Sequence, residues 1–301
     1  MAVAVVRFVL AQDSSRVVAA VAFTPYAAAG ALLAFTVVLL LRRWLAIAVA
    51  GAAVLALALT ILPRAIGEED AAAAGAPSFV VLTNNTRFGS VSPRALARLA
   101  RRSRADVLSL QELTPGLVER LDAVDGFRRR FPHRVLKARD GASGTGLFSR
   151  RPLEPVAAPE APGHEMTAAR AELRGIGALE LVSVHPVAPR GALETATWRA
   201  ALHSLPAAGR SASRRVLAGD FNATLDHAEL RRVIAGGYVD AAERSGDGLV
   251  PTYPAQRRLP ALLTIDHVLA DRRLAVLGTR TETLPGSDHR AVVARLAAPG
   301  S

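Results

Sequence analysis

Two long runs without a charged residue near the N-terminus constrain this chain more than any other feature. The runs cover residues 17–41 and 45–63, and an Arg-Arg-Trp segment at 42–44 separates them. Helices over these ranges would be about 37 Å and about 28 Å long, against a bilayer hydrocarbon core of roughly 30 Å. We therefore predict that residues 1–63 form a membrane segment with two transmembrane helices joined by a tight turn.

Two alternatives to this membrane hairpin remain open. A buried helical pair of a soluble protein is one, although such pairs are rarely so long and so free of charge. A signal peptide is the other, with 42–43 as its basic region and 71–76 as its cleavage site, but the acidic residues 68–70 disfavour cleavage. Basic residues of short loops favour the cytoplasm, so 42–43 predict a multi-pass cell-membrane protein whose C-terminal part is extracytoplasmic; Arg16 and Arg64 oppose this orientation.

The charge of the chain is concentrated in its C-terminal part. The 301 residues carry a net charge of +11, and residues 1–77 contribute only five Arg and four acidic residues to it. A basic domain suits an anionic partner such as nucleic acid, a phosphoester or anionic lipid. An arginine bias of the genome explains the charge equally well, because Lys137 is the only lysine. Cysteine is absent, so disulfides and thiolate metal sites are excluded.

The pattern of residues changes after the apolar runs. Residues 64–77 are rich in Ala, Gly and acidic side chains and are predicted to be a linker. From residue 78 to 301 short apolar runs alternate with turns, and Ser92 and Pro93 have the residue types that begin a helix. Many strands with few helices favour an α+β sandwich over a regular parallel array. The predicted strands cover residues 79–83, 106–110, 135–138, 146–148, 168–173, 179–184, 215–218, 263–269, 275–279 and 291–296.

Polar side chains with acid–base or metal-binding chemistry follow six of the apolar runs. In the segment Gly219-Asp220-Phe221-Asn222, the two polar side chains point the same way on an extended backbone and Phe221 points into a core. Because strand ends on one rim of a sheet converge, we expect the whole set to form one site. The set comprises Asn84-Asn85, Gln111-Glu112, His185, Asp220 and Asn222, Asp266-His267, and Asp288-His289.

These residue types together indicate hydrolysis of a phosphoester. Carboxylates and amides without thiolates suit a hard divalent cation, Mg²⁺ or Mn²⁺. A carboxylate beside a histidine supplies an oriented general base near neutral pH. A cation, an oriented imidazole and a positive surrounding would polarise a P–O bond toward attack by water. His267 is expected to be structural because alternation turns it away, and His164 and His227 lack any partner pattern.

The ordered motifs resemble the endonuclease/exonuclease/phosphatase superfamily, which includes pancreatic deoxyribonuclease, exonuclease III and neutral sphingomyelinases. The resemblance covers about residues 79–297, and six motifs in the right order make it specific. It implies a four-layer α/β sandwich of two mixed β-sheets flanked by helices. The motifs are Asn85, Gln111-Glu112, His185-Pro186, Gly219-Asp220-Phe221-Asn222, Ile265-Asp266-His267-Val268 and Gly286-Ser287-Asp288-His289.

The resemblance also implies a role for each residue. Glu112 would be the main metal ligand, with Asn85 (preferred over Asn84) and Asp288. Asp220 and Asn222 would orient or deprotonate the attacking water, touch the phosphate or bind a second ion. His289, held by Asp266, would be the general base or a phosphate contact, and His185 would bind a phosphate oxygen or protonate the leaving group. Whether Asp220 or His289 is the base, and whether one metal or two act, stays open.

The sequence therefore predicts a membrane-anchored, Mg²⁺- or Mn²⁺-dependent phosphodiesterase or nuclease with a catalytic domain over residues 78–301. One alternative is a lipid phosphoesterase of the sphingomyelinase or phosphoinositide type, which the membrane segment favours. Another is a catalytically silent binding module tethered to the membrane. No protein partner is predicted, and nothing in the motifs selects among DNA, RNA, phospholipid and inositol phosphate.

Overall fold

The described residues of the N-terminal part form three helices. The computed structural model describes residues 14–70, 75–160, 162–209, 213–255 and 260–298. The three helices are α2 (Ser15–Val21), α3 (Thr24–Leu40) and α4 (Trp44–Ile66).

The first apolar run differs from the single helix predicted over 17–41. It folds as α2 and α3, which are bent by 63° at the break between them. Pro25 lies in the first turn of α3, where its missing N–H and its ring favour a helix start over continuation of α2. The Thr24 hydroxyl donates to the carbonyl of Val21 at 2.7 Å and so satisfies one acceptor at the end of α2.

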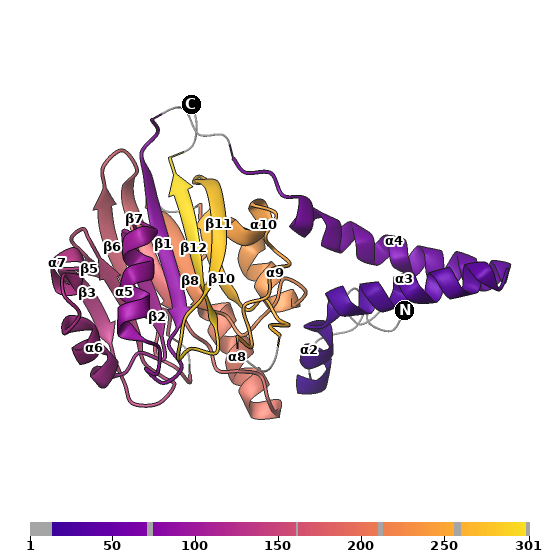
Figure 1. The fold of residues 1–301 in the computed structure, drawn as a ribbon, viewed down its shortest axis with the longest axis horizontal. Coiled ribbons are helices and arrows are strands. Elements are labelled where there is room, and N and C mark those ends of the chain that lie inside the picture. Colours follow the sequence, from indigo (N-terminus) through magenta and orange to yellow (C-terminus); the bar gives the residue numbers. More distant parts are fainter. Residues whose placement is uncertain (1–13, 71–74, 161, 210–212, 256–259, 299–301) are drawn as a thin grey trace.

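Helices α3 and α4 run antiparallel, pack against each other and project away from the rest of the molecule (Figure 1). The close packing uses Gly51, since a Cβ there would lie 3.3 Å from the ring of Phe35. Helix α4 continues past Pro63 to Ile66 and is the one helix among the described residues that is long and apolar enough by itself to cross a membrane. At 1.5 Å per residue it is about 35 Å long.

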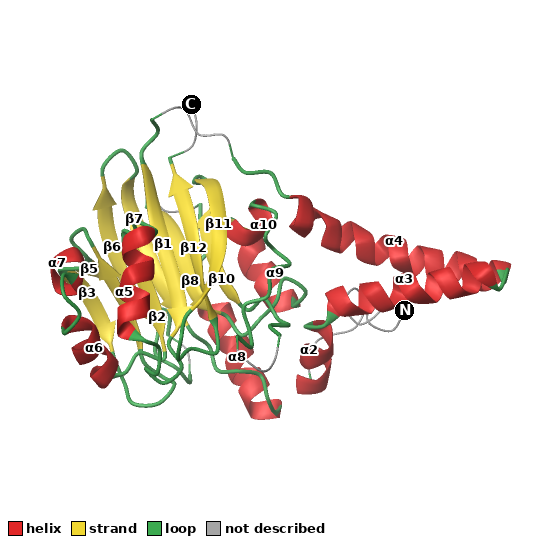
Figure 2. Ribbon diagram, viewed as in Figure 1, coloured by secondary structure: helices red, strands yellow, loops and turns green. Residues whose placement is uncertain are grey.

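The remainder of the described chain is a sandwich of two six-stranded mixed sheets (Figure 2). In the first sheet the order is β11-β12-β1-β2-β4-β3, and in the second it is β5-β6-β7-β8-β10-β9. The strands are β1 (Ser78–Asn85), β2 (Val107–Gln111), β3 (His133–Lys137), β4 (Thr145–Ser149), β5 (Glu154–Pro155), β6 (Thr167–Leu173), β7 (Gly177–Val184), β8 (Arg214–Asp220), β9 (Tyr238–Asp240), β10 (Asp266–Asp271), β11 (Ala275–Thr283) and β12 (Arg290–Ala297).

Helices cover the outer faces of both sheets and complete the four predicted layers. An apolar core fills the space between the sheets, where Val81 of β1 and Val216 of β8 are fully buried. A second core lies under α5 (Pro93–Arg102), α6 (Pro115–Asp122) and α7 (Phe127–Arg130), and a third under α8 (Ala192–Ser204) and α9 (Ala228–Ala235). The predicted sandwich of two mixed sheets is confirmed.

Several short elements were not predicted, and one strand starts later than predicted. Helix α10 (Ala241–Arg244), β5 and β9 are short, and each has too few residues for a periodic signal. The strand predicted over 263–269 begins at Asp266, because Leu263 instead forms an isolated bridge with Tyr253. This shift puts Asp266 at the start of the strand, next to the end of β8.

The N-terminal helices are joined to the sandwich by buried contacts. Val18 of α2 is 1% exposed and belongs to the core under α8 and α9. Arg64 of α4 forms a buried, two-pronged ion pair with Asp226, with both N···O distances at 2.9 Å. After α4, Asp70 bonds to the backbone of Val276 and pairs with Arg244. Helices α2 and α4 are thus fixed against the sandwich on the side of β8 and α9.

Candidate active site

The sheet topology brings the predicted polar residues to one edge of the sandwich. β1 and β2 are parallel, as are β7 and β8, so Asn85, Glu112, His185 and Asp220 all lie at or just past C-terminal strand ends. β12 is antiparallel to β1 and β10 is antiparallel to β8, so these strands begin where their partners end. The N-terminal ends of β10 and β12 therefore add the remaining residues, Asp266, Asp288 and His289, to the same edge.

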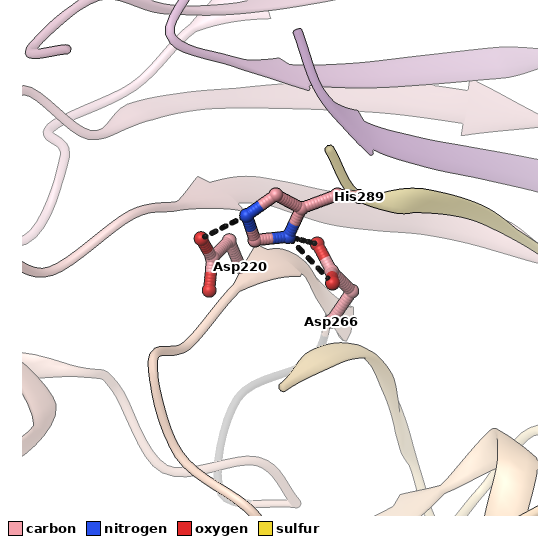
Figure 3. Close-up of side chains that lie close together, drawn as sticks. All are labelled: Asp220, Asp266 and His289. Carbon is pink, nitrogen blue, oxygen red and sulfur yellow. Dashed lines mark hydrogen bonds and ion pairs between the residues drawn. The ribbon is translucent and has the colours of Figure 1, made fainter. Parts of the chain in front are cut away.

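His289 lies between two buried aspartates (Figure 3). Its Nδ1 is 2.9 Å from Asp266 Oδ2, and its Nε2 is 3.7 Å from Asp220 Oδ2. The register of the second sheet pairs Asp266 directly with Asp220, which brings both carboxylates to one imidazole. Asp266 fixes the ring through Nδ1, and so leaves Nε2 facing Asp220 and the cleft.

Asn85 connects this group to the predicted metal ligand. Its amide Nδ2 donates to Glu112 Oε1 and to Asp220 Oδ2, both at 3.1 Å. Glu112 Oε2 accepts a bond from the backbone N–H of Phe88 at 2.7 Å, which fixes the second carboxylate oxygen. Asn84 points elsewhere and donates to the backbone carbonyl of His289 at 3.4 Å. Of the two amides, Asn85 is the one in the cleft.

Two further polar groups complete the cleft. His185 Nε2 lies 3.8 Å from Asp220 Oδ2 and 4.0 Å from Glu112 Oε1. The Asn222 backbone N–H donates to Asp220 Oδ1 at 2.9 Å, and its side-chain amide donates to the carbonyl of Pro186 at 3.0 Å. Asp220 Oδ2 thus faces an amide and two imidazoles, while Oδ1 is held by its own loop.

Local backbone conformation helps to place these side chains. Glu112 has φ of 52° and Asn222 has φ of 49°, in the left-handed region that non-glycine residues rarely occupy. Such conformations cost free energy and concentrate at functional sites. Gly219 lies so close to β7 that a Cβ would be 2.0 Å from the carbonyl oxygen of Val184, so no larger residue fits directly before Asp220.

Burial and mutual charge shift the acid–base properties of the site. Burial raises the pKa of Asp220 to about 7, although the nearby His289 charge acts in the opposite direction. Burial also raises the pKa of Glu112, and it lowers the pKa of His185 well below the usual value for an imidazole. For His289, burial would lower the pKa, but the carboxylates of Asp266 and Asp220 outweigh it and raise the pKa to about 10.

The residues present fit a divalent cation. Ligand atoms of Asp220, Asp266 and His289 lie within 4.8 Å of one another, which is close enough to share one ion. Within this group, His289 and Asp266 already hydrogen-bond to each other. Glu112 is a partly buried carboxylate, and the nearby charge of Asp288 raises the pKa of Glu112 further. A cation near Glu112 and Asp288 would relieve this repulsion. Asn85 would join as a ligand only after its amide turns, because Oδ1 now accepts from the Arg87 N–H at 2.9 Å.

The site also contains two aromatic rings that belong to none of the motifs. His164 lies against His185 with ring centroids 4.4 Å apart, and Tyr253, in a turn that the sequence offers as a possible cleft segment, lies against His289 at 4.7 Å, both pairs with tilted planes. His164 lies in a loop with no apolar run before it, so nothing in the sequence distinguishes it. His267 faces away from the cleft and bonds to Asp240 and to the carbonyl of Ala223, both at 2.8 Å.

The cleft that these residues line is large enough for more than a phosphate group. Its volume is about 700 Å³. Arg87 and Arg190 lie along it, and Arg87 Nε is 3.8 Å from Asp288 Oδ2. Val18 and Ala19 of α2 and the residue that caps its C-terminal end, Ala22, also line the cleft.

A two-sheet sandwich with carboxylates, amides and imidazoles at one edge defines a class of phosphoester hydrolases. The model of the endonuclease/exonuclease/phosphatase family matches residues 82–289, so the chain belongs to this family. The predicted family resemblance is confirmed, and members of the family are phosphoester hydrolases.

Solved structures of the same fold are similar to this chain at low sequence identity. An endonuclease/exonuclease/phosphatase from Beutenbergia cavernae has 19% identity and a TM-score of 0.54, and the match covers 74% of this chain and 72% of that one. TDP2 from D. rerio, complexed with a single-strand DNA product, has 19% identity and a TM-score of 0.55, covering 73% and 99%. No curated protein matches the chain.

Proposed function

We propose that this protein is a divalent-metal-dependent phosphodiesterase that is anchored in a membrane by α3 and α4. The observation that carries the proposal is the convergence of Glu112, Asp220 and His289 on one cleft from three separate strand ends. Residues from distant parts of a chain meet in this way where several groups must act on one reacting atom.

Glu112 and Asp288, with Asn85 after its amide turns, would hold Mg²⁺ or Mn²⁺. When bound, the cation supplies positive charge to a phosphate oxygen and so favours attack at phosphorus. The partly buried Glu112 and its neighbour Asp288 support this assignment, because two close carboxylates without a cation repel each other.

Asp220 is proposed to be the base that accepts a proton from the attacking water. Its pKa of about 7 allows both the proton-free and the proton-bound state near neutral pH. The water oxygen forms a bond to phosphorus, the water proton moves to Asp220 Oδ2, and the bond from phosphorus to the leaving alcohol oxygen breaks. Asn222 holds Oδ1 through its backbone N–H and so directs Oδ2 toward the cleft.

The two imidazoles are proposed to act as donors. His289 carries a proton at neutral pH because the aspartates on either side raise its pKa, so Nε2 can donate to the phosphate or to the leaving oxygen. Asp266 is the residue that orients this ring. His185, kept neutral by burial, is proposed to bind a phosphate oxygen through its Nε2 side, which faces Asp220 and Glu112.

The membrane assignment rests on α4 and on the apolar surface of the helical pair. Large apolar side chains of α3 and α4 are exposed, and Trp44 and Leu45 are 80% and 81% exposed. A surface of this kind is stable in contact with lipid and costly in water. With two helices crossing, both ends of the pair lie on one side, and the Arg42-Arg43 turn favours placing the catalytic part outside the cytoplasm.

A substrate panel on the full-length chain in detergent micelles tests this proposal. We expect turnover of at least one phosphodiester in the presence of Mg²⁺ or Mn²⁺ and loss of turnover with EDTA. The panel holds bis(4-nitrophenyl) phosphate, single-strand DNA, RNA, a phospholipid and an inositol phosphate. Absence of turnover on all five with both metals would contradict the proposal and favour a tethered binding module.

A further inference from the structure

We propose that α2 and the loop at Leu262 and Leu263 form an apolar entrance to the cleft, which selects a phosphodiester bearing a long hydrocarbon chain. This inference rests on the phosphodiesterase function proposed above and names the substrate class. It assigns a substrate-binding role to α2, a segment that lies outside every catalytic motif of the chain.

The first observation is that one wall of the cleft comes from outside the sandwich. Val18 and Ala19 of α2 and its C-cap Ala22 line the same cleft as Glu112 and His289. Val18 and Ala22 are buried against the sandwich, whereas Ala19 is exposed to the cleft. All three side chains are apolar and small or medium in size. This wall therefore offers apolar contact area to a substrate and presents no side-chain hydrogen-bond donor.

The second observation is that α2 is held in place by specific polar contacts. The backbone N–H of Thr224 donates to His227 Nδ1 at 2.8 Å, so the neutral ring carries its proton on Nε2. That Nε2 donates to the carbonyl of Val18 at 2.9 Å. Because His227 follows the Asp220–Asn222 loop directly, the wall and the catalytic carboxylate are positioned by one segment of the chain.

The third observation concerns the loop at Leu262 and Leu263, which lies beside the start of α3: Leu262 lines a small pocket together with Ala22 and Tyr26. Leu263 lines the cleft, and its neighbour Leu262 is 39% exposed. The hydroxyl of Tyr26, in the first turn of α3, donates to the carbonyl of Leu262 at 2.9 Å. Both parts of the entrance are therefore attached to the start of α3, α2 by chain connection and the loop by a hydrogen bond.

The bend between α2 and α3 gives this entrance an orientation. If α3 crosses the bilayer, a helix bent from it by 63° lies closer to the membrane plane than to the membrane normal. At the depth of α2, its small apolar side chains would contact the acyl chains of the lipid. Arg190 at the cleft would then lie near the lipid phosphates. A lipid can then place its phosphate at Glu112 and keep its chain along α2 and Leu263.

The apolar wall is the observation that favours this substrate over nucleic acid. A single strand would bind basic and aromatic side chains, and Arg87, Arg190, Phe88 and Tyr253 supply these on the rest of the lining. The wall formed by α2 is apolar, and α2 is connected directly to α3 (Figure 1). Single-strand DNA is nevertheless the natural competitor and belongs in the test.

Two chromogenic substrates with the same leaving group test the inference on the full-length chain in detergent micelles with Mg²⁺. They are hexadecyl 4-nitrophenyl phosphate and the water-soluble bis(4-nitrophenyl) phosphate. Ala19→Glu places a charge on the exposed position of the wall, and Ala20→Glu places the same charge on the next residue, which is exposed and outside the cleft lining. A third variant, Ala19→Trp, narrows the cleft at this wall without adding charge.

We expect the wild type to favour the hexadecyl substrate in kcat/KM. Ala19→Glu is expected to lower kcat/KM for the hexadecyl substrate about tenfold, which corresponds to the free energy of burying roughly two methylene groups. For the soluble substrate, kcat/KM should change less than about twofold. Ala20→Glu should behave as wild type. Equal loss on both substrates, no loss with either Ala19 variant, or faster turnover of single-strand DNA than of the hexadecyl substrate would overturn the inference.

Failure of the underlying function gives a different result. If the wild type hydrolyses neither chromogenic substrate nor DNA, the phosphodiesterase proposal itself is wrong. If it hydrolyses both chromogenic substrates without preference, the phosphodiesterase stands and the apolar entrance is rejected.

Discussion

Asp220 has more polar neighbours in the cleft than its position at a strand end would suggest. Its Oδ2 faces the Asn85 amide at 3.1 Å, His289 at 3.7 Å and His185 at 3.8 Å. The carboxylate is buried, so its charge depends on these neighbours and on the Asn222 N–H that donates to Oδ1. His289 in turn depends on Asp266, which contacts the other nitrogen of its ring.

The dependence of His289 on Asp266 gives the first prediction. Asp266→Asn removes a charge that raises the pKa of His289 and fixes its ring, so we expect kcat to fall by about 10²–10⁴-fold with a smaller change in KM. The double variant with His289→Asn should be no slower than the slower single variant, because the two residues act as a unit. Steady-state kinetics on bis(4-nitrophenyl) phosphate provides the measurement.

A second buried Asp–His pair in the same sheet provides the control. Asp240 and His267 are paired at 2.8 Å outside the cleft, so Asp240→Asn should lower Tm and leave kcat of the folded protein unchanged. A similar fall in kcat for Asp240→Asn and Asp266→Asn would show that Asp266 acts only on stability.

At the scale of elements, the notable contact is the one between α4 and the segment after β8. Arg64 and Asp226 are both almost fully buried. Their ion pair joins the C-terminal end of α4 to the loop that follows Asp220 and Asn222. A buried pair gives little net stability by itself, but removal of Arg64 takes away the cation that makes both of these 2.9 Å contacts with a buried carboxylate.

We therefore predict that Arg64→Met destabilises the folded protein by about 3–5 kcal/mol. Arg43→Met is the matched control, since Arg43 is exposed at the far end of the helical pair. The double variant Arg64→Met/Asp226→Leu should recover most of the loss, because no buried charge is left unpaired. Denaturant unfolding of the full chain in detergent measures all three; an effect of Arg64→Met within about 0.5 kcal/mol of wild type would refute the prediction.

The contact of α2 with His227 predicts a dependence of stability on pH. Burial lowers the pKa of His227 to about 4, with Arg231 and His267 adding in the same direction, whereas the unfolded chain titrates near the usual 6.5. The folded state therefore binds fewer protons between these values. Stability from this group is complete above about pH 6.5 and decreases as the pH falls toward 4, by up to about 3 kcal/mol.

Comparison of wild type with His227→Asn isolates this effect. We expect the variant to be less stable at pH 7, because it loses the contact with Val18, and to lose less stability than wild type on going from pH 7 to pH 4.5. Parallel stability curves for the two proteins over this range would mean that His227 is not the titrating group.

At the scale of the whole molecule, the sandwich and the helical pair form one structure. Val18 belongs to a core of the sandwich, and Arg64 and Asp70 bond to its loops and strands. A fragment beginning at residue 78 would expose the core around Val18 and leave Asp226 without Arg64. Experiments on function are for this reason designed on the full chain.

Much of the fold and of the site could be predicted from sequence, because the signals are local. Short apolar runs ending in Asn, Gln-Glu, His or Asp marked β1, β2, β7 and β8, and the residues given a catalytic or metal-binding role line or adjoin one cleft, whereas Asn84 and His267 point elsewhere. The rest depends on long-range geometry. The pairing of Asp266 with Asp220 follows from the β8–β10 register, and neither the cleft position of His164 nor that of Ala19 follows from a neighbouring residue.

The rate of bis(4-nitrophenyl) phosphate hydrolysis by full-length Glu112→Gln, with Mg²⁺ present, tests the central claim most directly. The substitution keeps the size of the side chain and removes the charge that would hold the cation. Glu119→Gln is the matched control on α6, exposed and outside the cleft. We predict a fall of about 10²–10³-fold for Glu112→Gln and none for Glu119→Gln; equal rates for wild type and Glu112→Gln would contradict the account.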